Sequence, residues 1–289
     1  MRPVEIHSIA QLRQTLAAVR RQGKKIGLVP TMGALHEGHL SLVRACRSEC
    51  GFTVVSIYVN PSQFGPAEDL AKYPRALEQD LQALASVGAD VAFVPTSDQM
   101  YAPGYATWVE VGSVAEPLEG QCRPGHFRGV ATVVLKLFNL VGADVAYFGQ
   151  KDYQQVLVVK QMARDLDVPT AIRVCPTVRE TDGLAMSSRN RYLSPTARER
   201  ALVLWKSLCL ARDLVAGGCC DAQAVADRMR EVILSADGAS IDYVAIADPD
   251  TLQPVATIER PVAALLAVRI DGTRLIDNCL LEPGARDEG

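Results

Sequence analysis

A doubly wound α/β domain followed by a smaller α+β domain is the fold class that this sequence predicts. Short, valine-rich apolar runs alternate with helical patterns as far as Cys175, which is typical of a parallel sheet covered by helices. After Arg191 the alternation gives way to helices followed by strands. Asp271-Gly272 joins the last two of these strands as a two-residue hairpin turn, so the second sheet is expected to be antiparallel.

The first domain is expected to start with a helix and then to alternate strand and helix. Ser8-Ile9-Ala10-Gln11 is a capping box that starts the first helix, and Gly23 ends it. Strands are predicted at 25–29, 53–59, 91–94, 145–148 and 171–175, with helices between them at 37–50, 74–87, 130–141 and 152–166. With right-handed crossovers, these elements give a Rossmann-like parallel sheet.

Residues 96–125 interrupt this alternation and are rich in proline and glycine. We expect loops there, with one short strand near 107–111. A stretch of this length without regular structure in a compact domain is more often functional than incidental.

The second domain is expected to combine two helices with three strands. Ser194 and Pro195 form an N-cap and first position for a helix that runs to 216, and another helix covers 222–234. Strands follow at 241–247, 261–270 and 273–281. The boundary lies within 176–190, so we predict domains of 1–177 and 178–289.

Composition excludes several classes of protein. The net charge is −3 and no basic block occurs, which argues against a nucleic-acid-binding protein. The apolar runs are too short to span a bilayer, and the first residues contain no apolar signal segment, so we expect a cytosolic protein without a membrane anchor. The eight cysteines include no C-x-x-C pair, and free thiols are expected.

The stretch from Val29 to Leu40 is the most informative part of the chain. A predicted strand runs into a turn, and a helix then opens with His36 and His39, which are three residues apart and therefore share one helix face. Free backbone N–H groups at such a junction bind anions, and two imidazoles there suit a polyphosphate that gains charge during reaction. A zinc site is disfavoured because the metalloprotease motif places its histidines at i and i+4.

Four further polar segments have both a functional and an ordinary interpretation. Asn60-Pro61-Ser62-Gln63-Phe64-Gly65 follows a strand, where open α/β sheets bind ligands, but alone it reads as a simple turn. Residues 123–129 form a basic loop that holds an anion or is merely solvated. Residues 149–155 include Lys151, which can reach a phosphate, and Gln154 or Gln155, either of which can face a cleft. Residues 186–190 offer two hydroxyls and an arginine, which is phosphate-binding chemistry, on a segment between the domains.

Together, these segments resemble a known family. The histidine pair and the late Met-Ser-Ser-Arg segment are similar to the HIGH and KMSKS motifs of class I aminoacyl-tRNA synthetases and related nucleotidyltransferases. The full set is narrower and resembles the pantothenate synthetase (pantoate–β-alanine ligase) family over almost the whole chain. It comprises Pro30-Thr31-Met32-Gly33, His36-Glu37-Gly38-His39, Asn60-Pro61-Ser62-Gln63-Phe64, Phe148-Gly149-Gln150-Lys151-Asp152-Tyr153-Gln154-Gln155 and Asp182-Gly183-Leu184-Ala185-Met186-Ser187-Ser188-Arg189-Asn190.

This resemblance implies an activity. Members of that family join pantoate and β-alanine with ATP and Mg²⁺, through a pantoyl adenylate that releases pyrophosphate and then AMP. Residues 1–177 would then bind ATP and pantoate, and residues 178–289 would act as a lid. The resemblance also implies a cytosolic homodimer that binds no nucleic acid.

The resemblance also implies roles for individual residues. His39, His36 and Lys151 would be catalytic, with His39 either a proton donor or an electrostatic stabiliser. Gln63 and Gln155 would bind pantoate, and Gln63 would also meet β-alanine. The ATP-binding residues would be Met32, Gly33, Ala34, Leu35, His36, Glu37, Gly38, His39, Gly149, Gln150, Lys151, Asp152, Val178, Met186, Ser187, Ser188 and Arg189. Mg²⁺ is expected mainly on phosphate oxygens, so no metal ligand is named.

Two other functions compete with this one. A nucleotidyltransferase that acts on a phosphate-bearing acceptor would share His39 and the Ser-Ser-Arg segment, but it would give no reason for the Gln63 and Gln155 pair. An RNA-binding relative of the synthetases conflicts with the acidic balance of the chain.

Overall fold

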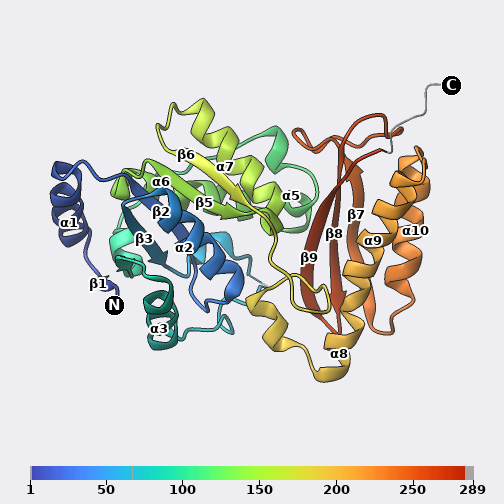
Figure 1. Cartoon of the computed structure of the whole chain (residues 1–289), viewed down its shortest axis with the longest axis horizontal. Helices are drawn as coiled ribbons and strands as arrows, with labels where there is room; N and C mark the ends of the chain where they lie inside the picture. Colours follow the sequence, from blue (N-terminus) through green and yellow to red (C-terminus); the bar gives the residue numbers. More distant parts are fainter. Residues whose placement is uncertain (1, 67, 284–289) are drawn as a thin grey trace. The chain divides into compact units, whose positions relative to one another are not determined.

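The chain folds into two compact units in the computed structural model, which describes residues 2–66 and 68–283 (Figure 1). The first unit comprises the chain up to Gln150 together with Gln154–Val178. The second comprises Lys151–Tyr153 and the chain from Arg179 onward. The chain thus passes from the first unit to the second after Val178. The sequence analysis did not predict that Lys151–Tyr153 would belong to the second unit.

The first unit is built on a six-stranded parallel sheet in the order β1-β4-β3-β2-β5-β6. Its strands are β1 (Val4–Ile6), β2 (Ile26–Thr31), β3 (Phe52–Ile57), β4 (Val91–Phe93), β5 (Val145–Gly149) and β6 (Ala171–Cys175). The strand order reverses direction between β2 and β5, where Gly27 pairs with Val145. Ligands of open α/β sheets bind at such a switch point, outside the carboxyl ends of the strands.

Helices cover both faces of this sheet. They are α1 (Ile9–Arg21), α2 (Glu37–Glu49), α3 (Leu77–Val87), α6 (His126–Val141) and α7 (Tyr153–Asp165), with short turns α4 (Ser97–Met100), α5 (Glu119–Cys122), η1 (Pro61–Gln63), η2 (Ser113–Ala115) and η3 (Gln150–Asp152). Alternate strand residues face opposite helix layers. Leu28 and Val54 belong to the core with α1, α6 and α7, whereas Val29 and Val55 belong to the core with α2 and α3.

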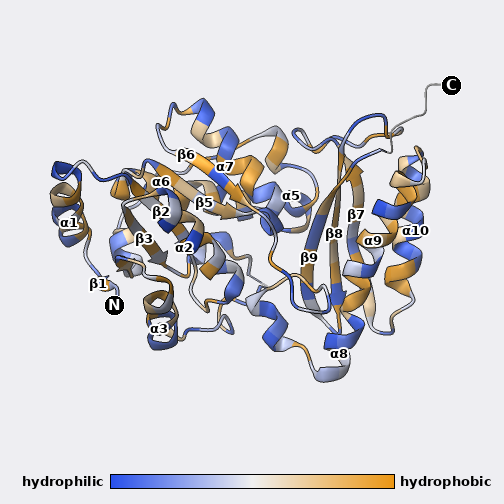
Figure 2. Cartoon of the chain, viewed as in Figure 1, coloured by the Kyte–Doolittle hydropathy of each residue, from blue (hydrophilic) through white to orange (hydrophobic). Residues whose placement is uncertain are grey.

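The second unit packs helices against an antiparallel sheet of three strands in the order β7-β8-β9. The strands are β7 (Ala239–Ala247), β8 (Val262–Ile270) and β9 (Thr273–Leu281), and the helices are η4 (Ser188–Tyr192), α8 (Pro195–Arg200), α9 (Leu202–Ala216) and α10 (Ala222–Leu234). Strand β8 is almost wholly apolar, while α9 and α10 carry both polar and apolar residues (Figure 2). Their apolar residues share one core with alternate residues of β8.

These observations confirm the predicted fold class. The predicted caps are also present: Ser8 Oγ accepts the N–H of Gln11, and Ser194 Oγ accepts the N–H of Ala197. Asp271 takes a positive φ of 47° between β8 and β9, as the predicted hairpin requires. All eight cysteines are free. Within the residues described, the structure contains no helix with the length and apolar character needed to cross a bilayer.

Several predicted boundaries are wrong for physical reasons. No strand forms at 107–111, because the Val109 N–H donates to Thr132 Oγ1 of α6 at 3.0 Å instead of to a neighbouring strand. Strand β1 was missed because three residues are too few to show a period. Helix α6 begins at His126 rather than 130, and the predicted helix up to 216 breaks at Ala201 without a proline or glycine to signal it.

Candidate active site

The segments singled out in the first domain follow the carboxyl ends of neighbouring strands. Residues 32–39 follow β2, residues 60–65 follow β3, and Gly149 ends β5, so that three adjacent strands deliver them to one edge of the sheet. Val178 lies three residues beyond β6, which is next to β5. The sequence-based prediction that these segments lie at strand ends is confirmed, and they meet at the switch point of the sheet.

His36 and His39 form the start of α2. His36 is the N-cap, and its Nδ1 accepts the backbone N–H of Gly38 at 3.2 Å. His39 Nδ1 accepts the backbone N–H of His36 at 3.3 Å, and the two ring centroids are 4.1 Å apart. Because both Nδ1 atoms act as acceptors, each neutral ring carries its proton on Nε2. The pair therefore offers two N–H donors of the kind that stabilise developing negative charge.

The turn before these histidines does not offer the free backbone N–H groups that the sequence suggested. The N–H of Gly33 donates to Thr31 Oγ1, and those of Ala34 and Leu35 donate to the Asp80 carboxylate. The His36 and Gly38 N–H groups are used by the imidazoles. That part of the prediction was wrong, since the protein fills the anion-binding turn with its own carboxylate. Side chains, rather than these amides, are left to meet a phosphate.

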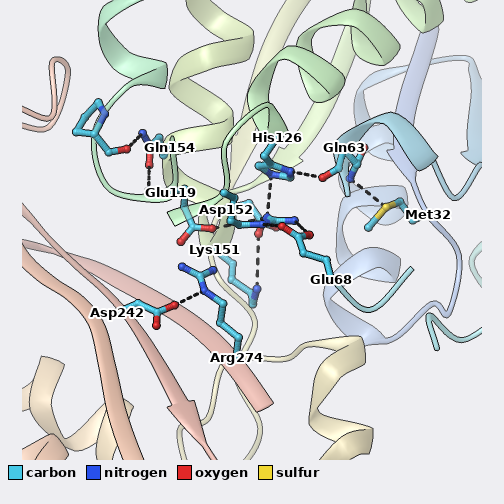
Figure 3. A network of polar contacts seen from close by, with 12 residues as sticks. Met32, Gln63, Glu68, Glu119, His126, Lys151, Asp152, Gln154, Asp242 and Arg274 are labelled. Atoms are coloured by element: carbon cyan, nitrogen blue, oxygen red, sulfur yellow. Dashed lines mark hydrogen bonds and ion pairs between the residues drawn. The ribbon is translucent and has the colours of Figure 1, made fainter. Parts of the chain in front are cut away.

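Gln63 lies on η1 and is held in place from several sides. Its Oε1 accepts Asn60 Nδ2 at 3.1 Å. Its Nε2 contacts the Sδ atom of Met32 at 3.1 Å (Figure 3). Asn60 is 1 % exposed and also donates to the carbonyl of Gly129 at 3.2 Å. A Cβ at Gly129 would lie 2.3 Å from the Ser62 carbonyl oxygen, so only glycine permits this approach of α6 to η1. Gln63 is therefore a preorganised amide beside the 32–39 segment.

A buried network supports the backbone of Gln63. His126 Nδ1 donates to the Gln63 carbonyl at 2.8 Å, and its Nε2 accepts from Arg123 at 3.0 Å (Figure 3). Arg123 forms a bidentate ion pair with Glu68 at 2.9 and 2.7 Å. Within residues 123–129, Arg123 is already paired with Glu68, and His126 is buried rather than solvated. Arg128 is exposed, and the interpretation of this loop as an anion site stays a prediction. Burial, reinforced by the nearby positive charge of Arg123, lowers the pKa of His126 to about 4.

The neutral state of His126 gives a testable pH dependence. In the unfolded chain its pKa is near 6.5, so between about pH 6.5 and 4 the unfolded state binds a proton that the folded state excludes. The free energy of unfolding should therefore fall as the pH drops through this window, by roughly 3 kcal/mol in total. In His126→Asn, which retains a donor to the Gln63 carbonyl, this component should disappear. Urea unfolding of both proteins from pH 8 to 4 measures it, and equal pH slopes would contradict the assignment.

The structure distinguishes the two neighbouring glutamines of α7. Gln154 is buried, and its Oε1 accepts the N–H of Glu119 (Figure 3). Its Nε2 donates to the carbonyls of Val114 and Pro117 at 2.9 and 2.7 Å. It therefore fixes the 114–119 segment. Gln155 is partly exposed on the neighbouring position of α7 and is the candidate for a substrate contact.

Lys151 and Asp152 belong to the second unit, which holds their backbone. The Lys151 carbonyl accepts Asn278 Nδ2 of β9 at 2.8 Å, and the Tyr153 hydroxyl donates to the carbonyl of Pro249 at 2.9 Å. The Lys151 side chain is 19 % exposed, with Nζ 3.6 Å from Asp152 Oδ1. No local pattern in the sequence indicates that residues so distant along the chain position Lys151.

Residues 186–189 form an ordered turn in the second unit. Ser187 caps η4 by accepting the Arg189 N–H at 3.3 Å, and Ser188 is buried. Asn190 anchors the turn by donating to Glu180 at 2.9 Å and to the Ala185 carbonyl at 3.2 Å. Met186, Ser187 and Arg189 are each partly exposed. The Ser187 hydroxyl and the Arg189 guanidinium thus lie together on an ordered turn, with the Ser188 hydroxyl buried between them in the sequence.

Over residues 2–66 and 68–283, no three His, Cys, Asp or Glu side chains gather as a metal site.

A family model, curated relatives and solved structures indicate the same family. A family model described as pantoate-beta-alanine ligase matches residues 5–280. The pantothenate synthetase of Moorella thermoacetica is 54 % identical over 96 % of this chain and 98 % of that protein. A crystal structure of pantothenate synthetase from Thermus thermophilus superimposes with a TM-score of 0.93 at 44 % identity, over 97 % of this chain and 100 % of that one. The pantoate-beta-alanine ligase of Francisella tularensis, solved with beta-gamma ATP and beta-alanine, gives 0.80 at 37 % identity, over 96 % and 97 % of the two chains.

Proposed function

Since the chain belongs to the pantoate-beta-alanine ligase family, we propose that it condenses (R)-pantoate with β-alanine to pantothenate at the expense of ATP. One observation carries this proposal: the family match runs from residue 5 to residue 280 and so includes all the segments described above. The Francisella tularensis ligase, solved with an ATP compound and beta-alanine, supports the choice of ATP as co-substrate.

The proposed reaction has two steps. A carboxylate oxygen of pantoate attacks the α-phosphorus of ATP, the bond to the β-phosphate oxygen breaks, and pyrophosphate leaves. The amine of β-alanine then attacks the acyl carbon of the pantoyl adenylate, loses a proton, and expels AMP as the amide forms. Direct attack of the amine on the free carboxylate would have to expel an oxide ion, which is a very poor leaving group. Forming the adenylate first replaces that leaving group with AMP.

We assign the polyphosphate to the donors of three segments. The Nε2–H groups of His36 and His39 would stabilise the charge that develops on the departing pyrophosphate, and Lys151 would add a positive charge. The remaining nucleotide contacts would come from residues 32–35, Glu37 and Gly38, from Gly149, Gln150 and Asp152, from Val178, and from Met186, Ser187, Ser188 and Arg189. Among these residues, the hydroxyl groups of Ser187 and Ser188 and the guanidinium of Arg189 suit phosphate oxygens. Mg²⁺, held mainly by those oxygens, would supply further charge neutralisation.

Gln63 and Gln155 are proposed to bind pantoate, and Gln63 also β-alanine. An amide offers a donor and an acceptor in fixed geometry, which suits a substrate with hydroxyl groups and one carboxylate. The Gln63 Nε2 atom donates to the sulfur of Met32, which is a weak acceptor, and a substrate oxygen would be a better one. We also propose that the protein is a cytosolic homodimer, as the family resemblance implied. Light scattering after gel filtration tests the dimer directly.

Product analysis tests the proposed function. The purified protein is incubated with ATP, Mg²⁺, pantoate and β-alanine, and pantothenate is measured by mass spectrometry. We expect pantothenate only when all three substrates are present. Omission of β-alanine should leave pantoate-dependent ATP–pyrophosphate exchange intact. Absence of both signals would overturn the proposal, and transfer of AMP to a phosphate-bearing acceptor would favour a nucleotidyltransferase instead.

A further inference from the structure

Asp80 is a buried carboxylate that the proposed reaction leaves without a role. It lies on α3, is 3 % exposed, and points both oxygens at the turn that precedes the histidine pair. Its Oδ2 accepts the N–H of Ala34 at 3.0 Å, and its Oδ1 accepts the N–H of Leu35 at 2.7 Å. Burying a carboxylate is costly unless hydrogen bonds compensate it, so these two contacts are strong constraints on the turn.

The backbone of this turn needs such a constraint. Ala34 has a φ of +52°, in the left-handed region that residues with a Cβ rarely adopt. At Gly33, which also has a positive φ of 80°, a Cβ would lie 2.9 Å from Asp80 Oδ2 and 3.0 Å from Ile57 Cγ2. The turn is therefore wrapped closely around the carboxylate, and its unfavourable conformation is stabilised from α3, which is more than forty residues away in the sequence.

The same turn determines what the histidines present. Leu35 is followed directly by His36, whose backbone N–H donates to His39 Nδ1 and so keeps the proton of that ring on Nε2. We propose that Asp80 is a positioning residue: it holds residues 33–35 so that His36 and His39 present their Nε2–H groups to the reacting phosphates. The catalytic part of this inference rests on the proposed function, whereas the effect on the histidine tautomer does not.

Asp80→Asn tests this role, because an asparagine keeps one acceptor but turns an NH₂ group toward the second backbone N–H. Losing one charged hydrogen bond loosens the turn that positions the histidines, so kcat for pantoate-dependent ATP–pyrophosphate exchange should fall about tenfold or more. The KM for β-alanine should stay unchanged. In long-range ¹H–¹⁵N spectra of the histidine rings, His39 should change from a pure Nε2–H tautomer to a mixture.

Asp144→Asn is the matched control. The Asp144 carboxylate accepts the N–H of Ile26, the first residue of β2, at 2.7 Å, whereas Asp80 holds the turn that follows the other end of that strand. This variant should leave both kcat and the histidine tautomers unchanged. An equal loss of kcat in both variants would show that Asp80 acts only through general stability and would overturn the proposal.

A second change removes the donor instead of the acceptor. Leucic acid incorporated at position 35 replaces the Leu35 N–H by an ester oxygen and leaves every side chain in place. It should lower kcat and mix the His39 tautomers as Asp80→Asn does. Wild-type kcat and tautomers in a folded ester protein overturn the proposal even if Asp80→Asn fails to fold. If the wild-type protein lacks ligase activity, the proposed function fails, but the tautomer spectra still decide the role of Asp80.

Discussion

His39→Ala is expected to fold normally and to lose pantoate-dependent ATP–pyrophosphate exchange by about 10²–10³ in rate. The His39 ring accepts the His36 N–H through Nδ1 and therefore offers an Nε2–H donor. If that donor meets the departing pyrophosphate, its contribution is made mainly in the transition state, so kcat should fall far more than the affinity for ATP. The rate of ATP–pyrophosphate exchange at saturating substrate gives kcat, and a titration with ATP gives its affinity.

The control for this variant is His7→Ala. His7 lies outside the site, and its Nδ1 contacts the Val94 carbonyl at 2.9 Å from an exposed position. Its removal should change neither kcat nor ATP affinity. A near-wild-type rate of ATP–pyrophosphate exchange in His39→Ala would contradict the catalytic role of His39. A loss of ATP affinity with unchanged kcat would show that His39 only binds ATP.

Gln63→Ala and Gln155→Ala are expected to raise the KM for pantoate by about 10–100-fold while ATP affinity stays within about twofold. Each amide would contribute a donor and an acceptor to pantoate, and its removal leaves polar groups of the substrate unpaired, at about 1–3 kcal/mol per group. Gln63→Ala should also raise the KM for β-alanine, and Gln155→Ala should not.

Gln161→Ala provides the control on the same helix as Gln155, because Gln161 pairs with Asp165 on an exposed stretch of α7. Its kinetic constants should match those of the wild-type protein. A fall in ATP affinity with unchanged pantoate affinity in the two site variants would show that the substrate roles are assigned wrongly.

Local patterns along the sequence were enough to predict the fold class and the strand ends that carry the site. Valine-rich runs and caps such as Ser8 and Ser194 depend on neighbouring residues, and most of the predicted elements form with shifted ends, the strand at 107–111 excepted. The histidine pair and Gln63 could be placed beside each other because consecutive strands of a parallel sheet end at one edge.

Contacts between distant segments could not be predicted in this way. Nothing in the local sequence distinguishes Gln154, which is buried against residues 114–119, from Gln155. Asp80 reads as a polar position of an amphipathic helix, yet it lies under the turn at Ala34. His126 reads as part of a basic loop, although it is buried and supports Gln63. Each of these roles depends on which helix packs against which turn, and that is a property of the tertiary structure.

The formation of a pantoyl adenylate is the central claim, and oxygen transfer tests it most directly. Pantoate labelled with ¹⁸O in both carboxylate oxygens is converted with unlabelled ATP and β-alanine, and the nucleotide products are analysed by mass spectrometry. Attack on the α-phosphorus followed by displacement of AMP predicts one ¹⁸O atom in each AMP, unlabelled pyrophosphate, and one ¹⁸O retained in the amide carbonyl of pantothenate. Formation of ADP together with ¹⁸O-labelled inorganic phosphate would instead show an acyl phosphate and contradict the account.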